Sequence, residues 1–171
     1  YIAGQSKTHY VVNGDFYTQS TNANNRISTT DILELRGNFY QYGATYFGRP
    51  STASGIVKFT GEGEQHVYFE RSDTAHNNLA LNLIVANEQN KIYADSPLYN
   101  VALSHDTVIA GEYVELPGCN TNKHNLKIEG NYLIQEHLRN NYFSESTITV
   151  TGDFRIQKRK DDGSFGESSG Y

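Results

Sequence analysis

Short stretches of alternating apolar and polar residues recur along the chain, and four of them have nearly the same sequence. Each reads apolar-x-apolar-x-Gly-(Asn/Asp)-aromatic, with a Gln four or five residues after the Gly. We call this pattern the repeat motif; it occupies residues 10–19, 33–41, 126–135 and 148–157. Alternation of this kind is typical of a half-buried β-strand, and repetition of one phrase along a chain is the signature of a repeat fold.

Each shared letter of the repeat motif has an expected structural role. The Gly is expected at a corner where the backbone has positive φ, and the following Asn or Asp tolerates such a turn and bonds to nearby backbone. The aromatic residues are expected to form a stack and the Gln residues an amide ladder, with Gln41 one position out of step. The residues with these roles are Gly14, Asp15, Phe16, Gln19, Gly37, Asn38, Phe39, Gln41, Gly130, Asn131, Tyr132, Gln135, Gly152, Asp153, Phe154 and Gln157.

The glycines of the motif are evenly spaced. The interval from Gly14 to Gly37 is 37 − 14 = 23, and the next interval, to Gly61 in an altered copy at 56–65, is 61 − 37 = 24. The interval from Gly130 to Gly152 is 152 − 130 = 22, and the gap between Gly61 and Gly130 is 130 − 61 = 69, or three times 23. Strand-like runs at 79–85, 101–103 and 107–111 fall inside that gap, so the period is expected to continue through it.

This period predicts an all-β fold, a parallel β-solenoid with coils of about 22–24 residues, in one domain covering 1–171. Solenoid coils repeat the same phrase in the same direction, so that equivalent residues stack. The stacked register places Glu34 beside Lys58. The alternative is a β-sandwich, which usually has turns every 8–12 residues and antiparallel strands.

Composition narrows the possible partners. The chain has a net charge of −5 and a pI near 5.6. Surfaces that bind nucleic acids normally carry a basic patch, so we expect no nucleic-acid partner. The single Cys119 cannot form an internal disulfide or a multi-cysteine zinc site. No apolar run approaches the ~20 residues of a membrane span.

No motif for catalysis or metal binding is present. The six histidines have no metal-ligand spacing, and nothing pairs two carboxylates in the manner of a glycosidase. We therefore predict no enzyme activity, no catalytic residues, no metal and no cofactor. The histidines are His9, His66, His76, His105, His124 and His137, and the carboxylates weighed for hydrolysis are Asp31, Glu34, Glu62, Glu64, Asp106, Glu112 and Glu115.

The copy Val-Asn-Gly-Asp-Phe-Tyr-Thr-Gln-Ser at 12–20, together with 148–157, resembles a tandem β-solenoid repeat of large Gram-positive bacterial secreted and cell-surface proteins. The resemblance covers roughly 10–70 and 125–157. It implies an extracellular or cell-surface location and a structural or adhesive role, and it implies no catalytic residues.

Neither end of the sequence reads as a polar cap of the kind that closes soluble solenoids. The leading hypothesis is therefore a structural protein whose copies stack end to end into a surface fibre or filament. The runner-up is an adhesin that binds glycans through exposed tyrosines, and a β-helix enzyme acting on polysaccharides comes third. The tyrosines in question are Tyr17, Tyr40, Tyr42 and Tyr46.

Overall fold

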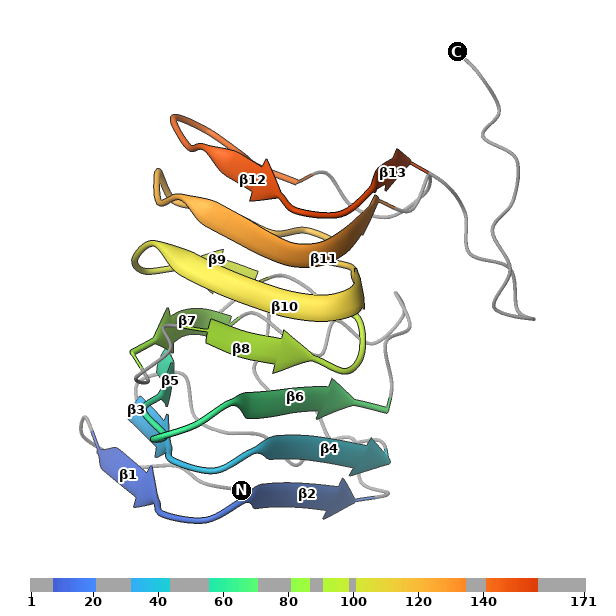
Figure 1. Ribbon diagram of the computed structural model, residues 1–171. Helices are drawn as coiled ribbons and strands as arrows, with labels where there is room; N and C mark the ends of the chain where they lie inside the picture. Colours follow the sequence, from blue (N-terminus) through green and yellow to red (C-terminus); the bar gives the residue numbers. More distant parts are fainter. Residues whose placement is uncertain are drawn as a thin grey trace.

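A computed structural model describes residues 8–20, 32–43, 56–70, 81–86, 91–98, 101–134 and 141–156. Every segment of regular structure in this part is a β-strand, and every strand pair is parallel. The strands stack one above another as the chain advances, from β1 and β2 at one end to β12 and β13 at the other (Figure 1). The fold is a parallel β-solenoid, as the period predicts, and the antiparallel β-sandwich is excluded.

Two sheets form the solenoid. The first sheet contains five strands in the order β1 (His9–Val12), β3 (Ile32–Leu35), β5 (Ile56–Phe59), β7 (Leu81–Val85) and β9 (Val101–Leu103). The second contains β2 (Phe16–Ser20), β4 (Phe39–Gly43), β6 (Gln65–Phe69), β8 (Lys91–Ala94), β10 (Thr107–Val114), β11 (Leu126–Ile134), β12 (Ile148–Val150) and β13 (Phe154–Ile156). Both β12 and β13 pair with β11, so the last coil follows one bent strand.

The core is one hydrophobic cluster to which both sheets contribute. Leu33 and Leu35 come from the first sheet, and Phe39, Ile109 and Ile128 come from the second. All five are at most 2% exposed. Because alternate residues of a strand face opposite sides of its sheet, this row of apolar positions accounts for the alternation in the sequence.

The register bears out one specific expectation and corrects another. Glu34 lies opposite Lys58, as predicted. The interval between aligned residues varies more than the motif spacing suggests: it is 108 − 91 = 17 from Lys91 to Val108, and 67 − 39 = 28 from Phe39 to Val67. The predicted interval of 22 to 24 holds at the two ends, where the motif is intact, with 39 − 16 = 23 in the first coil and 148 − 126 = 22 in the last.

The described residues contain no helix, and therefore none that is long and apolar enough to cross a bilayer.

Candidate functional site

The repeat motif forms a hydrogen-bonded corner that links each coil to the next. In the first coils Asp15 Oδ1 accepts a bond from Asn38 N (2.8 Å), and Asn38 Oδ1 accepts one from His66 N (2.8 Å). The polarity is constant: an Asn or Asp oxygen of one coil accepts the backbone N–H of the next coil. We call this chain of bonds the Asx ladder. It satisfies backbone donors that the turn removes from the strand pairing.

The last coils contain the same device. Asn131 Oδ1 accepts a bond from Asp153 N (2.9 Å). The backbone around it matches as well, since Tyr132 N donates to Asp153 O just as Phe16 N donates to Asn38 O, both at 2.8 Å. The motif therefore makes the same two hydrogen bonds between coils at both ends of the solenoid.

The glycines are required mainly because stacked backbones lie close together. A Cβ on Gly37 would lie 2.5 Å from Gly14 C, and a Cβ on Gly152 would lie 2.6 Å from Gly130 O. Both are shorter than real side chains allow. The expected positive φ is wrong for most copies: among the motif glycines in the described residues, only Gly130 has it, at 133°.

The motif glycines do not all occupy one column of the stack. Phe16 aligns with Phe39, then with Val67 and Ala94, and a Cβ on Gly111 in the next coil would lie 2.9 Å from Ala94 O. Gly130 then aligns with Gly111. The late glycines thus follow the column of the early aromatic residues. In the first coils the motif crosses from the first sheet to the second, whereas in the last coils it lies wholly within the second.

The predicted aromatic stack exists as two separate stacks. Phe16 and Phe39 have near-parallel rings with centroids 5.7 Å apart, and Phe39 lies 5.0 Å from Phe69. At the other end Tyr132 and Phe154 lie 5.7 Å apart. Because the two groups sit in different columns, they do not join into one stack.

The predicted glutamine ladder is not formed by the glutamines that are described. Gln19 lies opposite Tyr42, and Gln41, which is fully buried, lies opposite Thr18 and Phe69. Gln135 and Gln157 fall outside the described residues.

A different glutamine, Gln65 of the altered copy, closes the corner between β5 and β6. Its Nε2 donates to Leu35 O (3.0 Å) and Gly37 O (2.6 Å), and its Oε1 accepts a bond from Gly61 N (2.8 Å). The side chain is 1% exposed. One amide thus closes the corner of a coil that is longer than the first one. In the sequence, the only indication of this role for Gln65 was that the altered copy keeps both the Gly and the Gln of the repeat motif.

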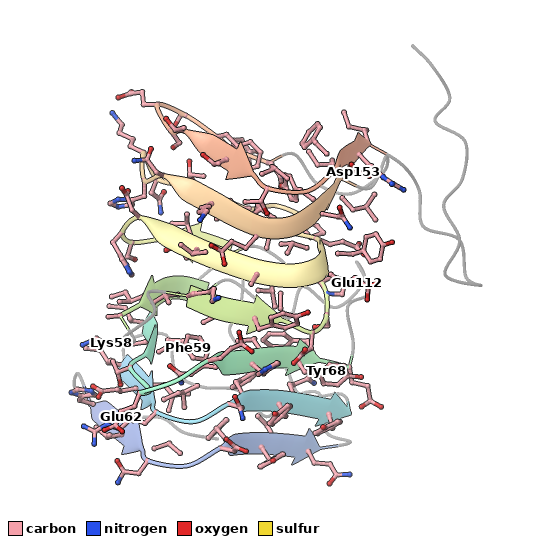
Figure 2. The ribbon with its side chains drawn as sticks, viewed as in Figure 1. Lys58, Phe59, Glu62, Tyr68, Glu112 and Asp153 are labelled. Atoms are coloured by element: carbon pink, nitrogen blue, oxygen red, sulfur yellow. The ribbon has the colours of Figure 1, made fainter. Side chains whose placement is uncertain are left out.

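The stack of described strands has edge strands at both ends. β1 and β2 have neighbours on one side only, as do β12 and β13. Large apolar side chains are exposed there: Val11 is 47% exposed and Tyr17 is 60% exposed at one end, and Phe154 and Ile156 are each 54% exposed at the other. Figure 2 shows Asp153 at the bend between β12 and β13, at the end of the stack. Unpaired edges with apolar side chains are templates for a further strand.

A second feature lies at the carboxyl ends of β6, β8 and β10. A hollow of about 410 Å³ there has three tyrosines and four carboxylates in its lining. Figure 2 labels two of the lining residues, Tyr68 and Glu112. The residues that line it are Tyr68, Phe69, Glu70, Tyr93, Ala94, Asp95, Ser96, Pro97, Glu112, Tyr113 and Glu115. Sequence reasoning considered Glu112 and Glu115 but did not place them together.

The tyrosines named for glycan binding form a column beside this hollow. The rings of Tyr17 and Tyr40 lie 5.0 Å apart with an interplanar angle of 18°, and Tyr40 and Tyr42 lie 6.5 Å apart at 17°. Near-parallel rings at these distances cover one another's faces. Tyr17, in the edge strand β2, is 60% exposed. Tyr46 is outside the described residues.

The histidines that are described contact carboxylates or backbone. His66 lies 2.9 Å from Asp95 Oδ2 and 3.2 Å from Glu64 Oε1, and His9 lies 2.9 Å from Glu34 Oε2. No cluster of three His, Cys, Asp or Glu suited to a metal ion occurs in the described ranges. His76, His137 and Asp31 are not among the residues described.

Two buried ionisable groups, Cys119 and Glu34, have pKa values that are shifted by burial and by their neighbours. Cys119 is fully buried, and this burial raises the pKa of its thiol to about 12, so it stays protonated at neutral pH. Burial alone would raise the pKa of Glu34, but hydrogen bonds from Thr60 and His9 and the charge of Lys58 together lower the net pKa. Glu34 is thus held as a carboxylate by its neighbours.

Comparison of the chain with family models, with curated proteins and with solved structures finds no match. The resemblance to Gram-positive surface repeats therefore stays an expectation from the motif alone.

Proposed function

We propose that this protein is a structural subunit whose coils continue from one copy to the next, forming a fibre or filament at a cell surface or outside the cell. The observation that carries this proposal is the pair of unpaired strand edges in the described solenoid, each with exposed apolar side chains. Between these edges, neighbouring coils bury apolar positions against each other. Adding a coil at the first edge would further bury the core-facing Tyr10 and Val12, and adding one at the last edge would bury Phe154. The residues aligned with these three, Leu33, Leu35 and Tyr132, are already buried.

The direction of the strands favours head-to-tail addition. All strands in both sheets are parallel and advance in one direction along the stack (Figure 1). One copy can therefore meet the next with β12 and β13 facing β1 and β2, and the same contact remains available at each new end. A head-to-tail contact that does not close into a ring generates an open filament.

Sedimentation velocity over a range of protein concentrations, followed by electron microscopy, tests the proposal. We expect assembly to grow with concentration and to give unbranched filaments. A population that remains compact and monomeric at millimolar concentration would overturn it.

A second candidate is glycan binding at the hollow, supported by tyrosines and carboxylates lining one concave site. Such a mixture provides apolar surface for a sugar ring and acceptors for its hydroxyl groups. A glycan array tests this candidate. We expect binding to neutral sugars that the substitution Tyr113→Ala abolishes while Tyr40→Ala, outside the hollow, leaves it intact. An array without any binding would reject the candidate.

A further inference from the structure

The structure also indicates how two copies meet, an inference that rests on the proposed function. We propose that the partner at the coil edge is a second copy of this chain, joined motif on motif: β12 on β1, β13 on β2, and Asp153 of one copy accepting a hydrogen bond from the backbone N–H of Asp15 of the next.

The polarity of the Asx ladder supports this joint. Asp15, Asn38 and Asn131 each accept a bond from the coil that follows. Asp153 donates its N–H to the coil before it and is the motif Asx of the last described coil. The side chain of Asp15 already accepts a bond from Asn38 N. The described residues contain no coil before Asp15 that could offer an oxygen to the backbone N–H of Asp15. An acceptor at one end thus matches a donor at the other.

Gly14 supplies an independent argument. The missing Cβ of every later motif glycine points at the backbone of the preceding coil, as for Gly37 toward Gly14 and Gly152 toward Gly130. A Cβ on Gly14 would meet nothing within 4 Å, and Gly14 lacks positive φ. A single copy therefore gives no steric or conformational reason for glycine at this position. A preceding coil from another copy would bring a backbone close to Gly14, which is the reason for glycine at the later motif positions.

The two edges have matching spacing and side chains. Three residues separate β1 from β2 (13–15), and three separate β12 from β13 (151–153). In the motif register Val150 meets Val12 and Phe154 meets Phe16, whereas straight continuation of the second sheet would place Gly152 on Phe16 and Phe154 on Thr18. The motif register pairs like with like, as inside the solenoid, where Phe16 stacks on Phe39.

One feature of the joint is unfavourable and makes it testable. Inside the chain the Asx ladder pairs an Asp with an Asn, as in Asp15–Asn38 and Asn131–Asp153. At the joint two carboxylates would be neighbours, and like charges directly opposite each other are destabilising. We therefore expect Asp153→Asn, which keeps the acceptor and removes the charge, to lower the concentration needed for assembly about three-fold or more. Asp153→Ala, which removes the acceptor, should raise it. The opposite order would contradict the ladder.

The sharpest variant is Gly14→Ala, with Gly63→Ala as its matched control, because a Cβ on either glycine meets nothing within 4 Å in a single copy. We expect both variants to keep the wild-type melting temperature. Gly14→Ala should raise the concentration needed for assembly at least ten-fold, measured by sedimentation velocity, whereas Gly63→Ala should leave it unchanged. Equal assembly of Gly14→Ala and wild type would overturn the joint.

Cysteine crosslinking reads the register directly. Neighbouring parallel strands place aligned Cα atoms within disulfide range. A mixture of Thr149→Cys and Val11→Cys chains should form a disulfide dimer under mild oxidation, and a mixture of Thr149→Cys with Asn13→Cys chains should not. Crosslinking of only the second pair would establish the straight-sheet register and overturn the inference, while the proposed function would stand. Absence of assembly in the wild type would overturn both.

Discussion

The first and last coils use the same motif for different purposes. In the first coils the motif is the corner at which the chain passes from the first sheet to the second, with β1 before it and β2 after it. In the last coils it is a bend inside the second sheet, between β12 and β13. The motif therefore specifies a local bend that lets parallel backbones stack closely, and it does not specify which sheet its flanks join.

The last coils make their change of sheet elsewhere, with a second Asx ladder. Asp106 Oδ1 accepts a bond from Asn125 N (2.8 Å), and Asn125 Oδ1 accepts one from Thr147 N (3.0 Å). These residues lie just before β10, β11 and β12. The side-chain oxygen that accepts from the next coil is thus the common element of both corners, and glycine is needed only where backbones approach most closely.

The largest expected effect separates the two regions by their glycines. Gly130 combines positive φ with a missing Cβ that would overlap Gly111 O. Strain in that backbone region and overpacking each cost roughly 1–3 kcal/mol, so Gly130→Ala should destabilise the fold by about 2–6 kcal/mol. Urea unfolding monitored by circular dichroism measures this loss. A change below about 1 kcal/mol would show that the bend is not strained.

Gly37→Ala should have a smaller effect, because only the steric term applies. Its Cβ would lie 2.5 Å from Gly14 C and 2.6 Å from Asp15 N, but φ is not positive. We expect a loss of about 1–3 kcal/mol in the same unfolding experiment. If Gly37→Ala proved as costly as Gly130→Ala, the two glycines would have the same role and the distinction between corner and bend would be wrong.

The smallest effect concerns acid stability at the second Asx ladder. Hydrogen bonds from the backbone N–H of Asn125 and then from its side chain lower the pKa of Asp106. A folded pKa below the unfolded one contributes stability above the unfolded pKa, about 4, and this stability is lost as pH falls through the folded pKa. Asp106→Asn should keep the acceptor and make the unfolding midpoint less sensitive to pH below about 4. Identical pH profiles for both proteins would contradict the assignment.

The motif was sufficient to predict the architecture, because strand alternation and a constant interval between glycines leave few folds other than a solenoid. It also predicted the pairing of Glu34 with Lys58, since residues one period apart stack. Both predictions depend only on residues of the repeat motif that recur in the same order along the chain. The first coils follow this logic most closely.

The central coils could not be predicted at residue level. The number of residues between aligned positions varies from 17 to 28 in these coils, because the loops between strands differ in length. The sequence of a loop does not show at which residue the next strand begins. Gln65 shows the difficulty: its amide closes a corner only because the stack places Leu35 O and Gly37 O beside it. Asp106 was considered only as a carboxylate for hydrolysis, and Asn125 was not singled out, because Asn and Asp are common in loops of every kind.

Fibre diffraction from oriented, concentrated protein tests the central claim most directly. If copies continue one another's coils, the strands lie perpendicular to the filament axis and their spacing repeats along it. The account predicts a reflection at ~4.8 Å on the meridian, parallel to the filament axis. Filaments with this reflection on the equator, or concentrated protein that forms no filaments, would contradict it.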